Sequence, residues 1–288
     1  MLTVVRMCLS LVLIALSASL LIFQYSEAPR KSRLQPSGEA YRPELSWVNS
    51  ISEARMVALS YIQRQSGTSD ERIVAGVDAF VRDRFSHGIS HVAGHENWIL
   101  AAAGGVPPFG LNIPVDVDSI LQHRHAMCSQ QSIVFMQLLE NFGMHYAAVR
   151  FSWPNEVASD RGHFAVAAKV DGIWRYYDSD LEAAYAPPVR EILNGRAIER
   201  TYPGHPWWVP HMKVAASQGT ILMDSVDAHP GPRGLFVQRL TKLLSRLTPL
   251  ILAIIATLVW PGVFEAINRH RKRVGMSRES GVRATCPA

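Results

Sequence analysis

Cysteine is scarce in this chain, which contains only Cys8, Cys128 and Cys286 among its 288 residues. These three residues lie in very different sequence contexts, so at most one disulfide is possible and no disulfide framework can hold the fold. Proline and glycine number only 17 and 19, which excludes a collagen-like chain, and 48% of the residues are hydrophobic, which excludes disorder for most of the chain. A hydrophobic core must therefore stabilise the protein.

The middle of the chain has no excess of positive charge. The net charge is +5, but residues 1–35 carry +3 and residues 265–288 carry +4, which leaves about −2 between them. A mildly acidic domain is a poor surface for phosphate groups. We therefore expect no nucleic-acid partner.

Two long stretches, residues 7–26 and 247–264, contain no charged residue. Each approaches the length that a helix needs to cross the hydrocarbon core of a bilayer. We predict an N-terminal membrane anchor within residues 1–34 and a transmembrane helix at residues 247–264, with the membrane as a partner of both spans. The alternatives are a cleaved signal peptide for the first stretch and a buried core helix for the second.

A basic tail, residues 265–288, follows the second stretch. Clustered basic residues close to a span are usually retained on the cytoplasmic side, so we expect this tail in the cytoplasm. Two spans then leave residues of about 35–235 outside, facing the periplasm of a bacterial inner membrane. The first span favours the opposite orientation, because more basic residues follow it than precede it. The basic cluster of the tail comprises Arg269, Arg271, Lys272 and Arg273. Arg6 precedes the first span, and Arg30, Lys31 and Arg33 follow it.

A connecting region, residues 224–246, lies between the expected domain at residues 35–223 and the second span. Proline and glycine residues predict a linker over residues 224–234. Residues 235–246 place apolar side chains at helical spacing with basic side chains between them, which predicts an amphipathic helix on the membrane surface. A further turn of helix packed on the domain fits the same periodicity.

The expected domain contains both helical and strand patterns. Residues 103–115, rich in glycine and proline, predict a loop, and Asp171-Gly172 between two apolar runs predicts a hairpin. We therefore predict an α+β fold. The first expected helix covers residues 51–62, and the second is capped by Ser69 or Asp70 and stops near Gly88. The third covers residues 130–142, with Cys128 or Ser129 at its N-terminus and Gly143 just after its end. The expected strands are residues 146–153, 163–170 and 173–177.

Three chemically reactive residues stand at the ends of these elements: Cys128 at the start of a buried helix, His163 at the start of one hairpin strand, and Asp178 at the end of its partner. A helix N-terminus and a nearby imidazolium favour the thiolate form of cysteine. A histidine can then carry the proton to a leaving group, and a carboxylate can orient the histidine. Because the hairpin strands fold back on each other, we expect His163 and Asp178 to be neighbours.

The order of these residues resembles that of the transglutaminase-like domains of the papain-like cysteine enzyme superfamily. The resemblance covers residues 70–185 and rests on Cys128, a histidine about 35 residues later in HFAVAAKVDG, and an aspartate about 15 beyond it in WRYYD. It implies a papain-like core, with a buried cysteine helix packed on an antiparallel sheet. It also implies that Cys128 is the nucleophile, His163 the general base and acid, and Asp178 the orienting carboxylate. The chain differs at Ala126 and Ser129, where many members have glycine and tryptophan.

These patterns lead to the hypothesis of a membrane-anchored cysteine enzyme that forms or cleaves amide or peptide bonds through a thioester. Its partner would be a protein or peptide substrate, and no cofactor is expected. The alternative hypothesis is a transglutaminase-like module that has lost catalysis and serves as a binding or scaffold element of the cell envelope.

Several nearby residues leave alternatives open. Asp180 competes with Asp178 for the carboxylate role, which we assign to Asp178 because it directly ends the aromatic strand. Gln122, six residues before Cys128, is an oxyanion-hole candidate, although we favour an exposed turn glutamine because a side-chain oxyanion donor must be held in fixed geometry.

Two further patterns have more than one interpretation. Together with Cys128, His123 and His125 form an H-x-H-x-x-C pattern that zinc can use, but no second pair of ligands completes a site, so we expect no metal. Trp207 and Trp208 could line a substrate groove, although such clusters more often serve packing.

Overall fold

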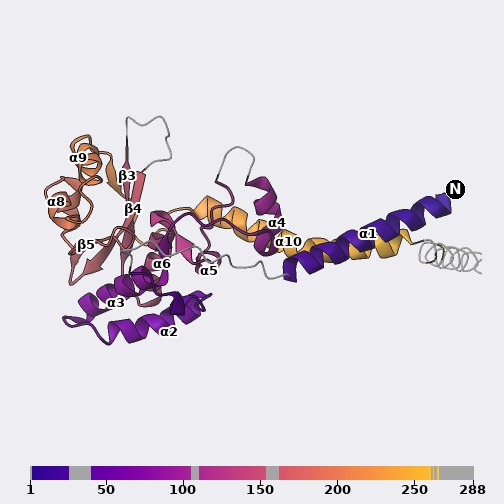
Figure 1. Ribbon diagram of the computed structural model, residues 1–288, viewed down its shortest axis with the longest axis horizontal. Helices are drawn as coiled ribbons and strands as arrows, with labels where there is room; N and C mark the ends of the chain where they lie inside the picture. Colours follow the sequence, from indigo (N-terminus) through magenta and orange to yellow (C-terminus); the bar gives the residue numbers. More distant parts are fainter. Residues whose placement is uncertain are drawn as a thin grey trace, which may run out of the picture. The chain divides into compact units, whose positions relative to one another are not determined.

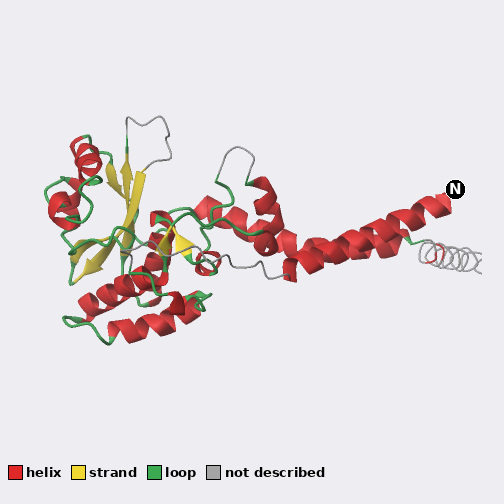
Figure 2. Ribbon diagram, in the orientation of Figure 1, coloured by secondary structure: helices red, strands yellow, loops and turns green. Residues whose placement is uncertain are grey.

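The computed structural model describes residues 2–25, 40–104, 110–153 and 162–260, together with Gly262 and Glu265. The chain has a mixed α+β fold, as predicted, and divides into two units (Figures 1 and 2). The larger unit comprises Lys31–Val92 and Ala103–Arg239. The smaller unit comprises Met1–Arg30, Ala93–Ala102 and Leu240–Ala288. Residues 93–102, which the sequence placed within the domain, thus group with the two long apolar helices.

A four-stranded antiparallel sheet forms the centre of the larger unit, with strand order β5-β4-β3-β6. The predicted hairpin between β4 and β5 is confirmed, because Asp171 (φ 48°) and Gly172 (φ 81°) both adopt the left-handed conformation that a tight turn of this kind requires. The edge strand β6 was not predicted. The strands are β3 (Tyr146–Ser152), β4 (Gly162–Val170), β5 (Ile173–Tyr177) and β6 (Ile221–Met223).

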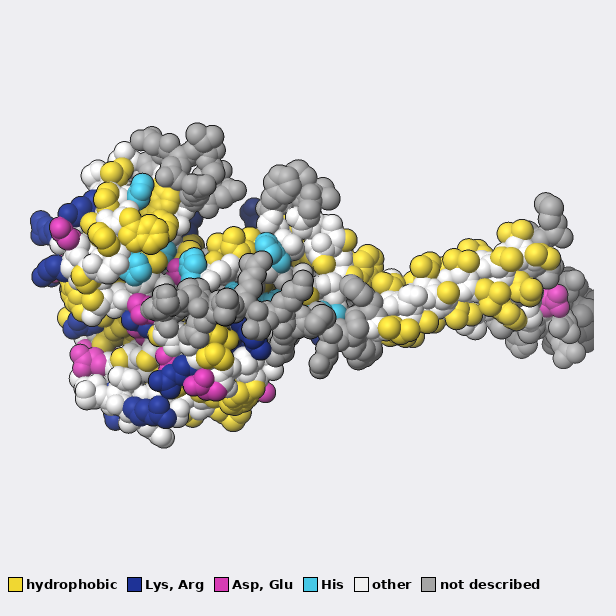
Figure 3. All heavy atoms as spheres, in the orientation of Figure 1, with side chains coloured by type: hydrophobic (Ala, Val, Ile, Leu, Met, Phe, Trp, Pro, Cys, Tyr) yellow, Lys and Arg dark blue, Asp and Glu magenta, His cyan; other side chains and the backbone are white. Residues whose placement is uncertain are grey.

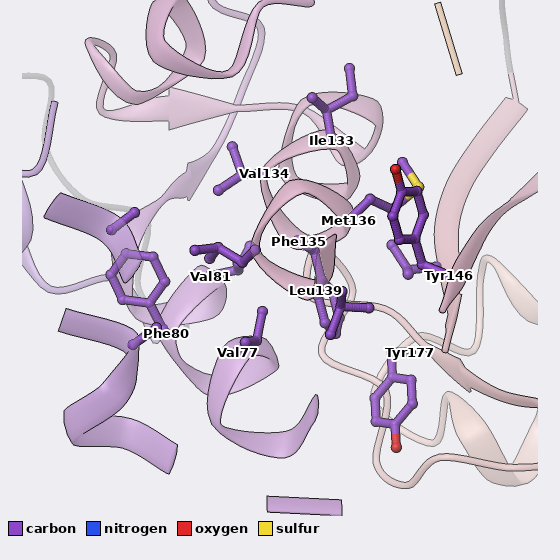
Figure 4. Packing of buried hydrophobic residues seen from close by; sticks show 14 of the residues in the cluster. Val77, Phe80, Val81, Ile133, Val134, Phe135, Met136, Leu139, Tyr146 and Tyr177 are labelled. Carbon is purple, nitrogen blue, oxygen red and sulfur yellow. The ribbon is translucent and has the colours of Figure 1, made fainter. Parts of the chain in front are cut away.

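One face of the sheet packs on α6 (Cys128–Asn141), which in turn packs on α2 (Ile51–Ile62) and α3 (Ser69–Arg84). Figure 4 shows side chains of α3, α6 and the sheet meeting in this cluster. Apolar residues surround most of α6, as its composition predicted, and Phe135, Leu138 and Leu139 are fully buried. Burying each such side chain stabilises the fold by about 1.5–3 kcal/mol.

The opposite face of the sheet is covered by three short helices, α7 (Val189–Leu193), α8 (Ile198–Thr201) and α9 (Val209–Ser217). The strands read as nearly continuous apolar runs because both faces are buried. Alanines on this face leave room for the helices to approach closely; they are Ala147, Ala165 and Ala167.

The predicted helix boundaries need two corrections at α3. Its N-cap is Thr68, not Ser69 or Asp70, because Thr68 and Glu71 form a reciprocal capping box. The helix ends at Arg84, before the predicted stop near Gly88, because the chain then enters the short strand β1 (Ser86–His87).

Smaller elements connect β1 to α6. The strand β1 pairs in parallel with β2 (His125–Ala126), directly before α6. A short helix, α5 (Val117–Leu121), precedes β2 and was not predicted, and a 3₁₀ turn occupies Pro43–Leu45. The predicted loop at residues 103–115 lies partly outside the described residues.

The smaller unit contains α1 (Leu2–Tyr25), α4 (Gly94–Ala103) and the C-terminal part of α10 (Pro232–Val259). Two serine hydroxyls join the long helices: Ser10 donates to the carbonyl of Ala256 (3.0 Å), and Ser17 donates to that of Pro249 (2.7 Å). Figure 1 shows α1 and α10 side by side. The predicted linker ends earlier than residue 234, since α10 begins at Pro232, and the helical segments expected at residues 235–246 and 247–264 belong to this one helix up to Val259.

Val4–Ile22 and Pro232–Val259 are long and apolar enough to cross a membrane. Figure 3 shows hydrophobic side chains along the paired helices α1 and α10. Many of them are exposed, which distinguishes them from the buried helices of a soluble core. Exposed examples include Leu9, Leu11, Val12 and Ile14 of α1 and Leu250, Ile251, Ile254 and Leu258 of α10. Part of the predicted span at residues 247–264 lies outside the described residues.

Candidate active site

Cys128 is the first residue of α6 and therefore lies at the positive end of the helix dipole. The parallel pairing of β1 with β2 fixes the chain just before it. Gln130 stabilises the same turn, because its side-chain oxygen accepts the Met127 N–H (3.0 Å) and its amide donates to Ser90 Oγ (2.9 Å). The thiol of Cys128 is free and half-buried.

The hairpin brings His163 of β4 and Asp178, which follows β5, to within hydrogen-bonding distance. Nε2 of His163 lies 2.5 Å from Oδ2 of Asp178, and the two side chains are only 4% and 1% exposed. The register pairs Val166 with Tyr177, so His163 and Asp178 lie diagonally on the same face of the sheet. The proximity expected from the Asp-Gly turn is thus present.

Electrostatic pairing outweighs burial for both groups. Burial by itself would lower the pKa of His163, but the Asp178 carboxylate, with a smaller contribution from Cys128, raises that pKa well above its usual value. Burial would raise the pKa of Asp178, but His163 and hydrogen bonds from Tyr202 and the backbone of Leu181 lower it. Between these two pKa values, Asp178 is a carboxylate and His163 an imidazolium.

Cys128 lies next to this pair. Its Sγ, one ring nitrogen of His163 and one carboxylate oxygen of Asp180 all lie within 4.8 Å of one another. Because Nε2 of His163 faces Asp178, Nδ1 is the ring nitrogen available to the thiol. The structure therefore brings together the three residues from which the sequence predicted a triad, in the order thiol, imidazole, carboxylate that a thiol nucleophile requires.

Asp178 receives hydrogen bonds from several buried donors. Tyr202 donates its hydroxyl to Oδ2 (2.5 Å), and the backbone N–H groups of Asp180 and Leu181 donate to Oδ1 (3.2 and 3.1 Å). Tyr176 hydrogen-bonds to the Tyr202 hydroxyl at 2.5 Å. These donors stabilise the negative charge in a water-poor environment.

The sequence analysis missed both tyrosines. A signal existed for Tyr176, which lies in β5 two residues before Asp178 and therefore points to the same side of the sheet. Tyr202 reaches the site from the end of α8, and no local pattern links it to Asp178.

Asp180, the competing carboxylate, also belongs to the site but in a different position. Its side chain is 3% exposed, and its Oδ1 accepts a hydrogen bond from Gln131 Nε2 (2.9 Å) and lies 2.8 Å from Nδ1 of His87. Asp178 contacts the imidazole at Nε2, whereas Asp180 lies on the side of Cys128. The site therefore contains two carboxylates with separate partners.

Aromatic rings pack against His163. The ring centroids of Phe151 and Trp208 lie 5.7 and 6.5 Å from that of the imidazole. Trp153 packs on Trp208 (6.1 Å), and Trp207 is 66% exposed beside it. Of the two tryptophans singled out in the sequence, Trp208 contacts the site directly. Its apolar surface excludes water, which strengthens the His163–Asp178 interaction.

The remaining sequence candidates lie apart from the triad. Gln122 is exposed at the C-terminal end of α5, where no hydrogen bond among the described residues joins it to Cys128. His125 pairs with Ser86 (Nδ1 to Oγ, 2.5 Å). Within the described part of the chain, the cluster of metal-ligating side chains around Cys128 does not include His123 or His125.

Comparisons with known proteins identify no relative. No model of a known protein family matches the chain, and neither a curated protein nor a solved structure is significantly similar to it.

Proposed function

We propose that this protein is a membrane-anchored, transglutaminase-like cysteine enzyme that forms or cleaves amide bonds in protein or peptide substrates. The observation that carries the proposal is the buried His163–Asp178 pair next to Cys128 at the start of α6. The packing of this cysteine helix on an antiparallel sheet supports a papain-like core. No cofactor is needed for this chemistry.

The reaction begins with attack of the Cys128 thiolate on the carbonyl carbon of an amide. A C–S bond forms and the carbonyl oxygen becomes an oxyanion. The oxyanion then collapses, the C–N bond breaks, and His163 donates its proton to the departing nitrogen. The products of this half-reaction are a free amine and a thioester on Cys128.

The second half-reaction releases the acyl group. Water or an amine attacks the thioester, and neutral His163 accepts the proton of this nucleophile. Breaking the C–S bond regenerates the thiolate and the imidazolium. Asp178 orients the imidazole throughout and stabilises its charged form.

An oxyanion stabiliser completes the proposed site. The backbone N–H of Cys128 belongs to the first turn of α6, where N–H groups have no helical partner. The side chain of Gln122 is the second candidate donor, and it would have to turn towards Cys128 when substrate binds.

The proposal predicts an unusually reactive thiol at Cys128. In a Cys8→Ser, Cys286→Ser background, we expect iodoacetamide to alkylate Cys128 rapidly at pH 7 and to remain effective as the pH falls. His163→Ala removes the imidazolium that stabilises the thiolate and should slow alkylation at pH 7 by about tenfold or more. Mass spectrometry of quenched samples measures the rate.

Negatively charged iodoacetate provides a second measurement. The imidazolium attracts this reagent, so the iodoacetate-to-iodoacetamide rate ratio should fall as the pH rises through the raised pKa of His163. His91→Ala, which alters an exposed histidine that is not a member of the triad, is the matched control. If Cys128 of the wild-type protein is alkylated no faster than Cys128 of the His163→Ala variant, the result would favour the inactive scaffold module over an enzyme.

For its location, we propose a bacterial inner membrane with the catalytic unit facing the periplasm. The support is the pair of apolar helices and the basic cluster that begins at Arg269 after the second of them. The basic residues after the first span favour the opposite orientation, so the orientation has to be measured.

Reporter fusions test the orientation. A reporter that is active only in the cytoplasm should be active when fused after Gly275, because the basic tail holds this end inside. A reporter that is active only outside the cytoplasm should be active after Gly231. The reverse pattern would invert the topology and place Cys128 in a reducing compartment.

A further inference from the structure

The side chains around Cys128 have the composition of a transition-metal site. Sγ of Cys128 in α6, a nitrogen of His163 in β4 and an oxygen of Asp180 in the turn after β5 lie within 4.8 Å of one another. In a tetrahedral zinc site, ligand atoms about 2.0–2.3 Å from the ion are about 3.3–3.6 Å apart. Small side-chain rotations would therefore bring these three atoms to coordination distance.

The second ligand, His163, is already oriented as metal-binding histidines are. Such a histidine usually donates its other ring N–H to a carboxylate, which fixes the tautomer and makes the free nitrogen more basic. In this site Nε2 faces Asp178 at 2.5 Å, which leaves Nδ1 for an ion.

The third ligand, Asp180, is held in the same manner. Gln131 Nε2 donates to its Oδ1 (2.9 Å), and Nδ1 of His87 lies 2.8 Å from the same oxygen. The other carboxylate oxygen is left for coordination. The side chain is 3% exposed, so little water competes for it.

We propose that Cys128, His163 and Asp180 bind one divalent transition metal of the zinc class and that this ion reversibly blocks the thiol. Three protein ligands leave a fourth position for water, and the thiolate excludes magnesium and calcium as preferred ions. The sulfur and Nδ1 carry one proton between them, and metal binding releases this proton to solvent. This site differs from the H-x-H-x-x-C pattern in the sequence, with which it shares only Cys128.

The inhibitory part of the inference rests on the proposed function, because a metal-bound sulfur cannot attack a carbonyl. Metal binding itself does not depend on catalysis. The two can therefore be tested separately on the same protein.

Cobalt(II) is the probe for binding, because a thiolate ligand gives it a charge-transfer band in the near ultraviolet. The full chain in detergent, with Cys8→Ser and Cys286→Ser, should show this band at one equivalent of cobalt. Cys128→Ala should abolish the band, and Asp180→Asn should weaken binding at least tenfold. His125→Gln, which alters the competing pattern, is the control and should bind like the parent.

Zinc is the probe for the block. Zinc should slow iodoacetamide alkylation of Cys128 at least tenfold, and EDTA should restore the original rate. Zinc should also raise the midpoint of thermal unfolding of the parent and not of Asp180→Asn. Unfolding midpoints without metal show whether each variant is folded.

Two results would overturn the inference: no charge-transfer band at saturating cobalt, or a band of unchanged affinity in a folded Asp180→Asn protein. A cobalt band, together with metal-free alkylation of Cys128 no faster than in the His163→Ala variant, would support metal binding and refute the proposed enzyme. Rapid metal-free alkylation without a cobalt band would support the proposed enzyme and refute metal binding.

Discussion

Replacing Cys128 with alanine is expected to abolish amide-directed activity and leave the fold intact. The proposed mechanism passes through a thioester on this sulfur, and the carbon of alanine cannot form one. Nucleophile replacements of this kind reduce turnover by about 10³-fold or more, to the residual rate that binding and oxyanion stabilisation provide. Amine release from peptide substrates, or amine incorporation into them, measures the loss.

The fold should survive the change because Cys128 is half-buried at a helix end, and alanine removes a single sulfur atom. We expect the midpoint of thermal unfolding to change by at most about 2–4 °C, which corresponds to about 1 kcal/mol for a domain of this size. Cys8→Ala is the matched control, because Cys8 is an exposed thiol in α1. Activity that survives in a folded Cys128→Ala protein would exclude a thiol mechanism.

The local part of the site could be predicted from the sequence. The Asp171-Gly172 pair defines a two-residue turn, and that turn fixes which residues of β4 and β5 face each other. His163 and Asp178 follow from this register. The start of α6 at Cys128 follows from the apolar helix and the glycine after its end.

The contacts between distant segments could not be predicted in the same way. Tyr202 reaches Asp178 across 24 residues, and Asp180 approaches Cys128 only because α6 and the turn after β5 lie together. Such contacts depend on tertiary packing, which periodicity does not encode. The continuity of α10 was missed for a different reason: proline at the first turn of a helix fits well, so Pro232 begins the helix and does not mark a linker.

Among the residues that the structure describes, Arg84 is the largest fully buried side chain, and no pattern in the sequence singled it out. It is 1% exposed at the end of α3, and its guanidinium donates to the carbonyls of Val48 (2.9 Å), His123 (3.0 Å) and Leu121. The central guanidinium carbon of Arg84 lies 4.7 Å from the centroid of the Phe85 ring. One cation thus satisfies three carbonyls from two separate segments, one of which leads through β2 to Cys128.

Arg84→Met is therefore expected to destabilise the protein by about 2–4 kcal/mol. Each buried carbonyl left without a donor costs about 1–3 kcal/mol, and part of this cost is offset because methionine avoids the desolvation of a buried charge. The midpoint of thermal unfolding should fall by about 4–16 °C. Arg84→Lys keeps the charge but loses the planar fork, so its effect should be intermediate. The control is Arg42→Met, which breaks an exposed ion pair with Asp83 (2.9 Å) and should cost less than about 1 kcal/mol. Equal shifts for Arg84→Met and Arg42→Met would show that the buried guanidinium does not hold these segments together.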